Sequence, residues 1–267
     1  MVVLNPDAAS VSASALAEAA ERARLKLPEL NRIFESGQCL PLSRLATSEE
    51  AALVKDELQA LGVDSGIVSH AELQLDSAPK KVRALEISDE GVTAAVVASP
   101  ERLTARWEDV ILLVAGRLIA SRVEVEHRRR RGRNQPVDTR QLSSDETVLD
   151  LYIGSESINW RIIANSFDFS CLGAAKSPTA YENFTALVDV LRKRAANASF
   201  DDSYARVRPA LSAVWPIEPK DRKGEWRRSG AGKFDMATVT TTDNEDQFTR
   251  YSRLRHWLKL RALESER

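Results

Sequence analysis

The sequence predicts an α+β protein in which antiparallel strands are covered by an amphipathic helix. Three features indicate this: an alternating hairpin over residues 148–164, a capped helix from Thr179, and a run of short strands over residues 82–126. Strands joined by short turns favour antiparallel pairing, and a helix with one apolar stripe needs a sheet to cover. At 267 residues the chain is long enough for one large or two modest domains.

The hairpin is predicted from a period of two. Leu149, Leu151 and Ile153 alternate with polar residues, and a second run over residues 158–164 repeats the pattern after a short polar turn. Each strand should therefore have one face against a core and one face toward water. The row expected to face water comprises Asp150, Tyr152, Asn159 and Arg161.

The helix after the hairpin begins with Thr179 and Glu182 at the spacing of a capping box. Five residues at helical spacing form its apolar stripe, which should lie on the sheet: Tyr181, Phe184, Leu187, Val188 and Leu191.

The N-terminal part divides into a helical segment, residues 1–36, and a small β-α-β unit, residues 37–76. Strands are expected over residues 39–45 and 63–70. A capping box at Thr47 and Glu50 opens the helix between them, and Gly62 stands where a C′ glycine ends one.

Residues 82–126 predict five strands, with breaks at Asp89–Gly91, at Ser99–Glu101 and near Gly116. With the hairpin the count is seven strands followed by one helix. This order, and the tract Leu103–Val110 with Trp107, resembles the pleckstrin-homology-like fold of small bacterial proteins over residues 82–196. The β-α-β unit is similar to a ferredoxin-like half in a short prokaryotic signal-transducing family. These resemblances imply binding modules rather than a catalytic motif.

Residues 199–267 are expected to form a C-terminal helical extension. Residues 204–214 have helical spacing interrupted by Pro209. Residues 220–233 are rich in glycine and charge and read as an exposed loop, and an amphipathic helix follows from about Glu245.

Composition sets limits on the class of protein. The apolar fraction is 43% and the net charge is −1, so any signal for an acidic partner must be local. Two cysteines are too few for a disulfide framework and favour a reducing compartment. No signal peptide or membrane span is indicated, and a cytoplasmic protein is expected.

Two basic segments are the candidate anion-binding sites. The first comprises Arg128, Arg129, Arg130, Arg131 and Arg133. It could bind anionic lipid headgroups or nucleic-acid phosphates, or it could be a solvated loop whose charge is balanced by nearby acidic residues. In the second, Trp226 stands beside Arg227 and Arg228, which suits phosphate binding with base stacking, although the tryptophan could pack on its own domain.

The C-terminal helix offers a third surface for a partner through Arg250, Arg253 and Trp257, although a helix packed on its own sheet has the same periodicity. Catalytic and metal-ligating residues are not indicated, because His70, His127 and His256 have no cysteine or carboxylate at ligand spacing. Cys171 lies in an apolar setting typical of an inert thiol. No cofactor is expected.

These observations favour a non-catalytic binding, scaffolding or signalling module that recognises an acidic protein or an anionic membrane surface through its arginine-rich loops. A nucleic-acid-binding protein is one alternative. An enzyme whose site is assembled from distant residues is the other, and it requires a deep polar pocket. The sequence leaves the oligomeric state open.

Overall fold

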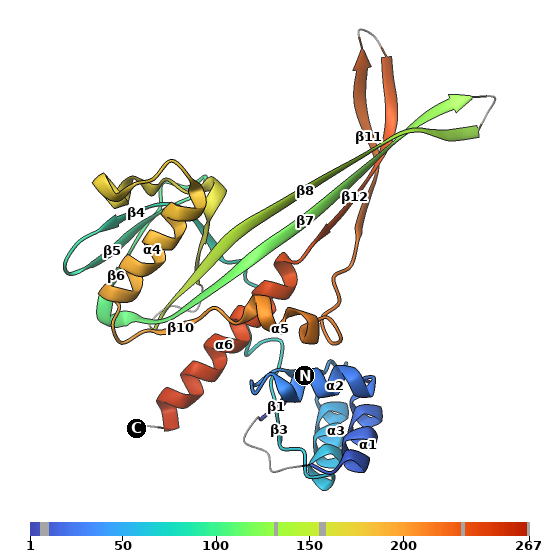
Figure 1. The fold of residues 1–267 in the computed structure, drawn as a ribbon, viewed down its shortest axis with the longest axis vertical. Helices are drawn as coiled ribbons and strands as arrows, with labels where there is room; N and C mark the ends of the chain where they lie inside the picture. Colours follow the sequence, from blue (N-terminus) through green and yellow to red (C-terminus); the bar gives the residue numbers. More distant parts are fainter. Residues whose placement is uncertain (6–10, 131–132, 155–158, 231–232, 266–267) are drawn as a thin grey trace.

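The computed structural model describes residues 1–5, 11–130, 133–154, 159–230 and 233–265, and within residues 126–138 and 221–238 it describes the backbone without side chains. The protein is α+β. Figure 1 shows an elongated molecule: a small N-terminal unit and a larger body lie at one end, and a long β ribbon projects from the body. Among the described helices, none combines the length and apolar character of a membrane span.

A nine-stranded sheet organises the body, with β11-β12-β7-β8-β9-β4-β5-β6 in order and β10 beside β7. Neighbouring strands are antiparallel, except that β4 is parallel to β9 and β10 is parallel to β7. The strands are β4 Lys80–Ile87, β5 Gly91–Val96, β6 Arg102–Arg106, β7 Val110–Arg130, β8 Arg133–Ile153, β9 Trp160–Ile163, β10 Ser199–Asp201, β11 Lys220–Gly230 and β12 Lys233–Asp243.

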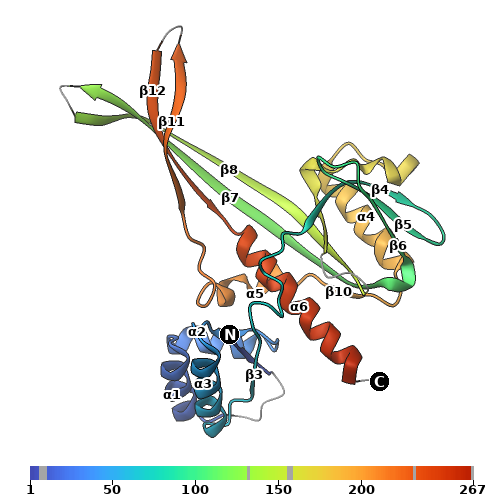
Figure 2. The ribbon, with the colours of Figure 1, turned by 180° about the vertical axis from the view of Figure 1, so that it is seen from behind.

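Helices cover both faces of this sheet. Leu149, Leu151 and Ile153 of β8 belong to one core with the apolar side chains of α4, Ala180–Arg194. The intervening Val148 and Tyr152 belong to a second core with α5, Tyr204–Leu211, and α6, Glu245–Ser265. Seen from behind in Figure 2, α6 crosses the base of the ribbon and α4 lies against the other part of the sheet. The predicted helix on a sheet is confirmed. Short 3-10 turns are η1 Trp107–Asp109, η2 Ala164–Ser166 and η3 Phe169–Ala175.

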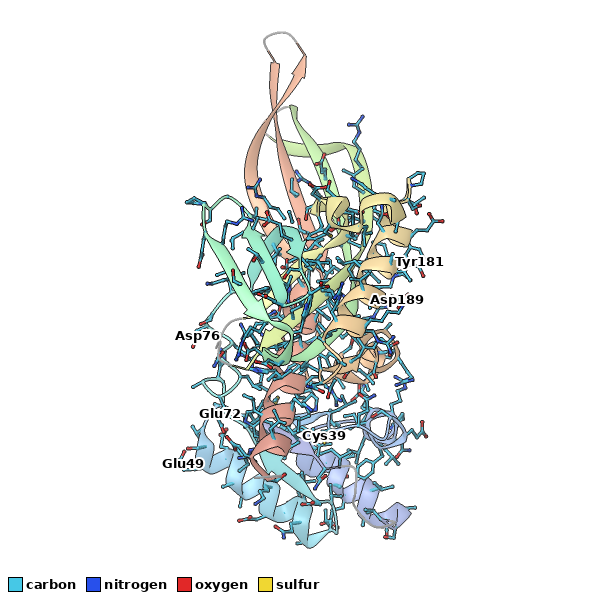
Figure 3. The ribbon with its side chains drawn as sticks, turned by 90° about the vertical axis from the view of Figure 1, so that its left-hand side faces the viewer. Cys39, Glu49, Glu72, Asp76, Tyr181 and Asp189 are labelled. Atoms are coloured by element: carbon cyan, nitrogen blue, oxygen red, sulfur yellow. The ribbon has the colours of Figure 1, made fainter. Side chains whose placement is uncertain are left out.

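The start of α4 is as predicted, since the Thr179 hydroxyl accepts a hydrogen bond from the Glu182 backbone N–H at 3.3 Å. Four of the five predicted stripe residues are buried: Phe184, Leu187, Val188 and Leu191. Tyr181 is the exception, with an exposed fraction of 70%, and Figure 3 shows it on the outer side of the helix with Asp189. As the second residue of the helix, it lies before the stripe reaches the sheet.

The N-terminal unit has its own three-stranded sheet, β2-β1-β3, in which β1 is antiparallel to both neighbours. Its elements are β1 Val2–Leu4, α1 Ala13–Ala23, α2 Leu27–Glu35, β2 Pro41–Ser43, α3 Ser48–Ala60 and β3 Ser65–Ile67. Residues 1–36 therefore supply the central strand of this sheet as well as helices. Three buried apolar residues were too short a run to predict that strand.

Three further expectations differ from the structure. Residues 110–126 form one strand rather than two, so six strands rather than seven precede α4. Residues 220–230 form β11 and Lys233 begins β12, in place of the expected loop. The described part of residues 199–267 contributes three strands besides its helices. The pairing of β12 with β7 stabilises strand structure in a segment with no apolar alternation of its own.

The row predicted to face water is buried. Asp150 and Arg161 are 0% exposed, and Asn159 and Tyr152 are at most 2% exposed. The reason is α6, which begins more than eighty residues after Arg161 and covers this face of β8 and β9.

Candidate functional site

The register of the sheet brings the two basic segments of the sequence to one end of the ribbon. β12 pairs with β7 from Asp243–Ala120 to Met236–His127, and β11 pairs with β12 along its length. β8 pairs with the other edge of β7 as far as Arg130–Arg133. Four strands therefore run together, and beyond the Met236–His127 pair they separate into two hairpin ends, which diverge in Figures 1 and 2.

We call these two ends the basic fork. One end is formed by residues 127–130 and 133–135, the other by residues 226–230 and 233–236. Arg128, Arg129, Arg130 and Arg133 thus lie on strand ends rather than in a loop, and Trp226, Arg227 and Arg228 lie on β11. Arg131 lies outside the described residues. Sequence reasoning found both segments, and the structure adds that they are neighbours.

The cross-strand partners in the first end are not acidic. Arg128 is opposite Gln135, Arg129 is opposite Asn134, and Arg130 is opposite Arg133. In the second end Arg228 is opposite Phe234, whereas Arg227 is opposite Asp235. Like charges at opposed positions destabilise a strand pair. The ends therefore concentrate positive charge that the directly opposed residues mostly leave uncompensated.

Charge is divided between this end and the rest of the molecule. Residues 127–135 and 226–236 together contain 8 of the 38 Lys and Arg residues but only 1 of the 39 Asp and Glu residues. The remainder of the chain consequently has a net charge of −8. A net charge of −1 for the whole chain thus conceals a strongly basic fork on a net acidic remainder.

The two arginines of β7 on the described part of the ribbon below the fork have acidic partners. Arg117 donates two hydrogen bonds to Asp145, at 3.0 and 2.6 Å, and Arg122 lies 2.9 Å from a Glu124 oxygen. At the foot of β11, the Lys220 ammonium donates to Asp246 at 3.0 Å. The ribbon stem is therefore locally neutralised where its side chains are described.

Asn244 fixes the base of the ribbon at the corner between β12 and α6. Its side-chain oxygen accepts a hydrogen bond from the Ile119 N–H at 2.6 Å, and its amide donates to the Arg117 carbonyl at 2.9 Å. The same amide donates to the hydroxyl of Tyr204 at 3.0 Å. Burial raises the pKa of Tyr204 to about 12, so this hydroxyl remains protonated at neutral pH. These bonds hold the strand edge, α5 and α6 together.

Gly116 allows α6 to approach the ribbon closely. A Cβ added at this position would lie 2.4 Å from one ring carbon of Phe248 and 3.2 Å from the ring of Tyr204. The two rings pack edge to face with their centroids 5.0 Å apart. The foot of the ribbon is thus fixed by both packing and hydrogen bonds, which gives the fork a defined direction relative to the body.

The residues predicted to form a binding surface on α6 have mainly internal roles. Arg253 is 1% exposed and donates to the Gln74 side chain at 3.2 Å and to the Ser77 carbonyl at 3.3 Å. Arg250 is half-buried. Trp257 is also half-buried and lines a hollow, and the guanidinium of Arg261 lies 4.3 Å from its ring centre. For Arg253 the prediction of an accessible partner-binding residue is wrong, because α6 is enclosed by the sheet and the N-terminal unit.

The interior holds a charged cluster that sequence reasoning missed. The Arg161 guanidinium donates two hydrogen bonds to Asp150, at 2.7 and 2.8 Å, and a third to the Thr249 hydroxyl at 2.9 Å. The Ser252 hydroxyl donates to Asp150 at 2.7 Å. Burial alone would lower the pKa of Arg161, but the charge and hydrogen bonds of Asp150 raise that pKa above its ordinary value. Arg161 therefore stays charged, and these hydrogen bonds tie β8 and β9 to α6.

His256 packs beside this cluster. Its ring stacks on Tyr152 with centroids 4.2 Å apart. Burial, and then the positive charge of Arg253, lower the pKa of His256 to about 4, so the imidazole is neutral at physiological pH. Burial, and then the charge of Asp150, raise the pKa of Tyr152 above its ordinary value. Both rings therefore act as neutral packing groups.

Two hollows lie on the surface outside the basic fork. One of about 240 Å³ lies between the N-terminal sheet and α6, where Figure 3 shows Cys39 beside the helix. An open depression of about 450 Å³ lies near Arg106 and Arg194. In the described part of the chain, no three His, Cys, Asp or Glu residues are grouped so that they could hold a metal ion.

Comparisons of this chain with protein families, with curated proteins and with solved structures find no match.

Proposed function

We propose that this chain is a binding module that binds an anionic partner at its basic fork. The observation that carries the proposal is the Met236–His127 pair, which joins two segments about a hundred residues apart at one end of one ribbon. Guanidinium groups suit this task, because their planar donors match the oxygen pairs of phosphates and carboxylates.

The cost of the fork arginines to folding supports a role for them in binding another molecule. Opposed arginines such as Arg130 and Arg133 weaken a strand pair by a few tenths of a kcal/mol or more. The arginines of β7 on the described stem, such as Arg117, are matched by acids. Arginines that destabilise a strand pair and have no opposed acidic residue are expected where a binding partner supplies the compensating negative charge.

Distance supports the same conclusion. From Gly116, at the foot, to Arg130 the strand spans about 45 Å at roughly 3.3 Å per residue. The Debye length at physiological ionic strength is about 8 Å, so the net negative body scarcely weakens the positive potential at the fork. The ribbon holds the arginines away from the acidic body and presents them to a partner.

Salt-dependent retention on immobilised heparin tests the proposal. A fork variant replaces five arginines, R128Q, R129Q, R130Q, R227Q and R228Q. A control variant makes the same change in charge with exposed residues outside the ribbon: K26Q, R32Q, R192Q, K193Q and R194Q. We expect the wild-type and control chains to be retained, and the fork variant to elute at much lower salt. Equal elution of the fork and control variants would overturn the proposal.

The finer fold assignment is also part of this proposal. Strands β4–β9 followed by α4 support a pleckstrin-homology-like module, with β7 and β8 extended into the ribbon. The unit β2-α3-β3, with β1 between its strands, supports a ferredoxin-like half. We further propose a cytoplasmic location, supported by a sequence whose two cysteines are too few for a disulfide framework.

A further inference from the structure

We infer that the anionic partner is a nucleic-acid duplex, with both ends of the basic fork placed on its phosphates. This inference rests on the proposed function and deepens it by naming the class of partner. It is carried by the dimensions of the fork, by the residue types at its ends and by the charge of the rest of the chain.

The dimensions of the fork match a groove. Beyond the Met236–His127 pair each hairpin continues alone for three residue pairs, which end at Arg130–Arg133 and Gly230–Lys233. Three pairs correspond to about 10 Å along a strand. The major groove of B-form DNA is about 12 Å wide and about 8.5 Å deep, and it admits a two-stranded ribbon. Two such ribbons that diverge from one sheet can contact phosphates at two places on one duplex.

The residue types favour a duplex over other polyanions. The first end continues from its arginines into Asn134 and Gln135, and Arg, Asn and Gln are the side chains that form paired hydrogen bonds with base edges. Residues 127–135 contain no Phe, Tyr, Trp or aliphatic residue. Single strands are held mainly by stacking on aromatic rings, and membrane interfaces are entered by apolar or aromatic side chains. The second end contains Trp226 and Phe234, whereas the first has the imidazole of His127 as its one ring.

The charge of the remaining chain determines how the molecule approaches. A duplex carries about one negative charge per 1.7 Å of its axis and repels the rest of the chain, whose net charge is −8. Attraction at the fork and repulsion of the rest of the chain orient the long axis toward the duplex. An acidic protein could also bind the fork, but it does not need the residue types of the first end.

The experiment measures binding of the full chain by fluorescence anisotropy over a series of salt concentrations. The probes are a labelled DNA duplex of 20 base pairs, the single strand of the same length, and vesicles containing phosphatidylserine. The proteins are the wild type, one variant for each end (R128Q/R129Q/R130Q and R227Q/R228Q) and the control K26Q/R32Q/K193Q. Circular dichroism establishes that each variant is folded.

We expect the wild type to bind the duplex at least tenfold more tightly than the single strand, with a steep dependence on salt. Each lost phosphate contact should flatten the slope of log K against log salt by about 0.9. Each fork variant should therefore lose at least tenfold in duplex affinity with a flatter slope, and the control should match the wild type.

Three results would overturn the inference, and together they separate its failure from that of the proposed function. Equal binding to single strands or to vesicles, abolished by the fork variants, would retain an anion-binding fork but exclude the duplex. A loss of duplex affinity in only one of the two fork variants would show that the two ends do not bind the duplex together. An absence of binding to all three probes and to heparin would overturn both the inference and the proposed function, and would leave the arginines a role in solubility.

Discussion

Arg161 and the arginines of the fork occupy strands of the same sheet but differ in what lies opposite them. Arg161 is directly opposite Asp150, and both are completely buried under α6. Arg129 and Arg130 are opposite Asn134 and Arg133. An arginine with an opposed carboxylate contributes to folding through that partner. An arginine without one contributes little to folding. The opposed residue therefore distinguishes arginines that stabilise the fold from arginines that are available to bind another molecule.

The largest effect is expected from breaking the interior pair. Asp150→Ala leaves the Arg161 guanidinium buried without its partner, and such changes lower the free energy of unfolding by about 3–5 kcal/mol. Urea denaturation measures this. The double variant D150V/R161M, which removes both charges, should be closer to the wild type. If Asp150→Ala lowers the free energy of unfolding by less than about 1 kcal/mol, the buried pair is not essential to stability.

Protonation of His256 is expected to have the next largest effect. The unfolded chain binds this proton at an ordinary pKa near 6.5, whereas the folded pKa is about 4. The unfolded state therefore binds more protons between these values, and stability falls as the pH is lowered from about 6.5 to 4, by about 3 kcal/mol.

Stability measured at several pH values in His256→Phe and in wild type isolates this effect, because other acid-sensitive pairs are common to both. The variant keeps an aromatic ring against Tyr152 and should show a shallower loss. The control His70→Gln changes an exposed histidine and should follow the wild type. Parallel curves for all three proteins would show that burial of His256 does not affect acid stability.

A smaller effect is expected at the foot of the ribbon. Gly116→Ala places a methyl group within 2.4 Å of the Phe248 ring, and overpacking of this kind costs about 1–3 kcal/mol. Gly66→Ala is a matched control, because a Cβ there meets no atom within 4 Å. Thermal unfolding of the two variants should differ by several degrees, with G116A the lower. Equal midpoints would mean that α6 has room to move at this contact.

The smallest effect on stability is expected at the fork itself. Replacing Arg128, Arg129 and Arg130 by Gln removes charges that have no opposed acid, so the free energy of unfolding should change by less than about 0.5 kcal/mol. Slight stabilisation would agree with relief of like-charge repulsion. Destabilisation by more than about 1 kcal/mol would show that these arginines serve the fold, and the contrast with Arg161 would disappear.

Local signals in the sequence predicted much of the fold. The caps at Thr47 and Thr179, the apolar row of Leu149, Leu151 and Ile153, and the helix from Glu245 depend on neighbouring residues, and the structure confirms them. Both basic segments of the candidate site were also found from composition alone.

What could not be predicted depends on distant partners. Asp150 and Arg161 alternate as surface residues do, and only α6, far along the chain, buries them. β11 has no apolar alternation, so its strand structure depends on its pairing with β12, which in turn pairs with β7. The arrangement of the fork follows from the Met236–His127 pair, for which neither segment contains a local signal.

The corner at Asn244 has a mechanical consequence. A side chain that bonds to the edge of β7 also stands directly before α6, which in turn holds the N-terminal unit through Arg253. Force applied near Arg130 therefore acts about 45 Å along β7 from the foot of the ribbon, where the strand is attached to the first turn of α6. Tension or bending at the tips is transmitted through this attachment to the opposite end of the molecule.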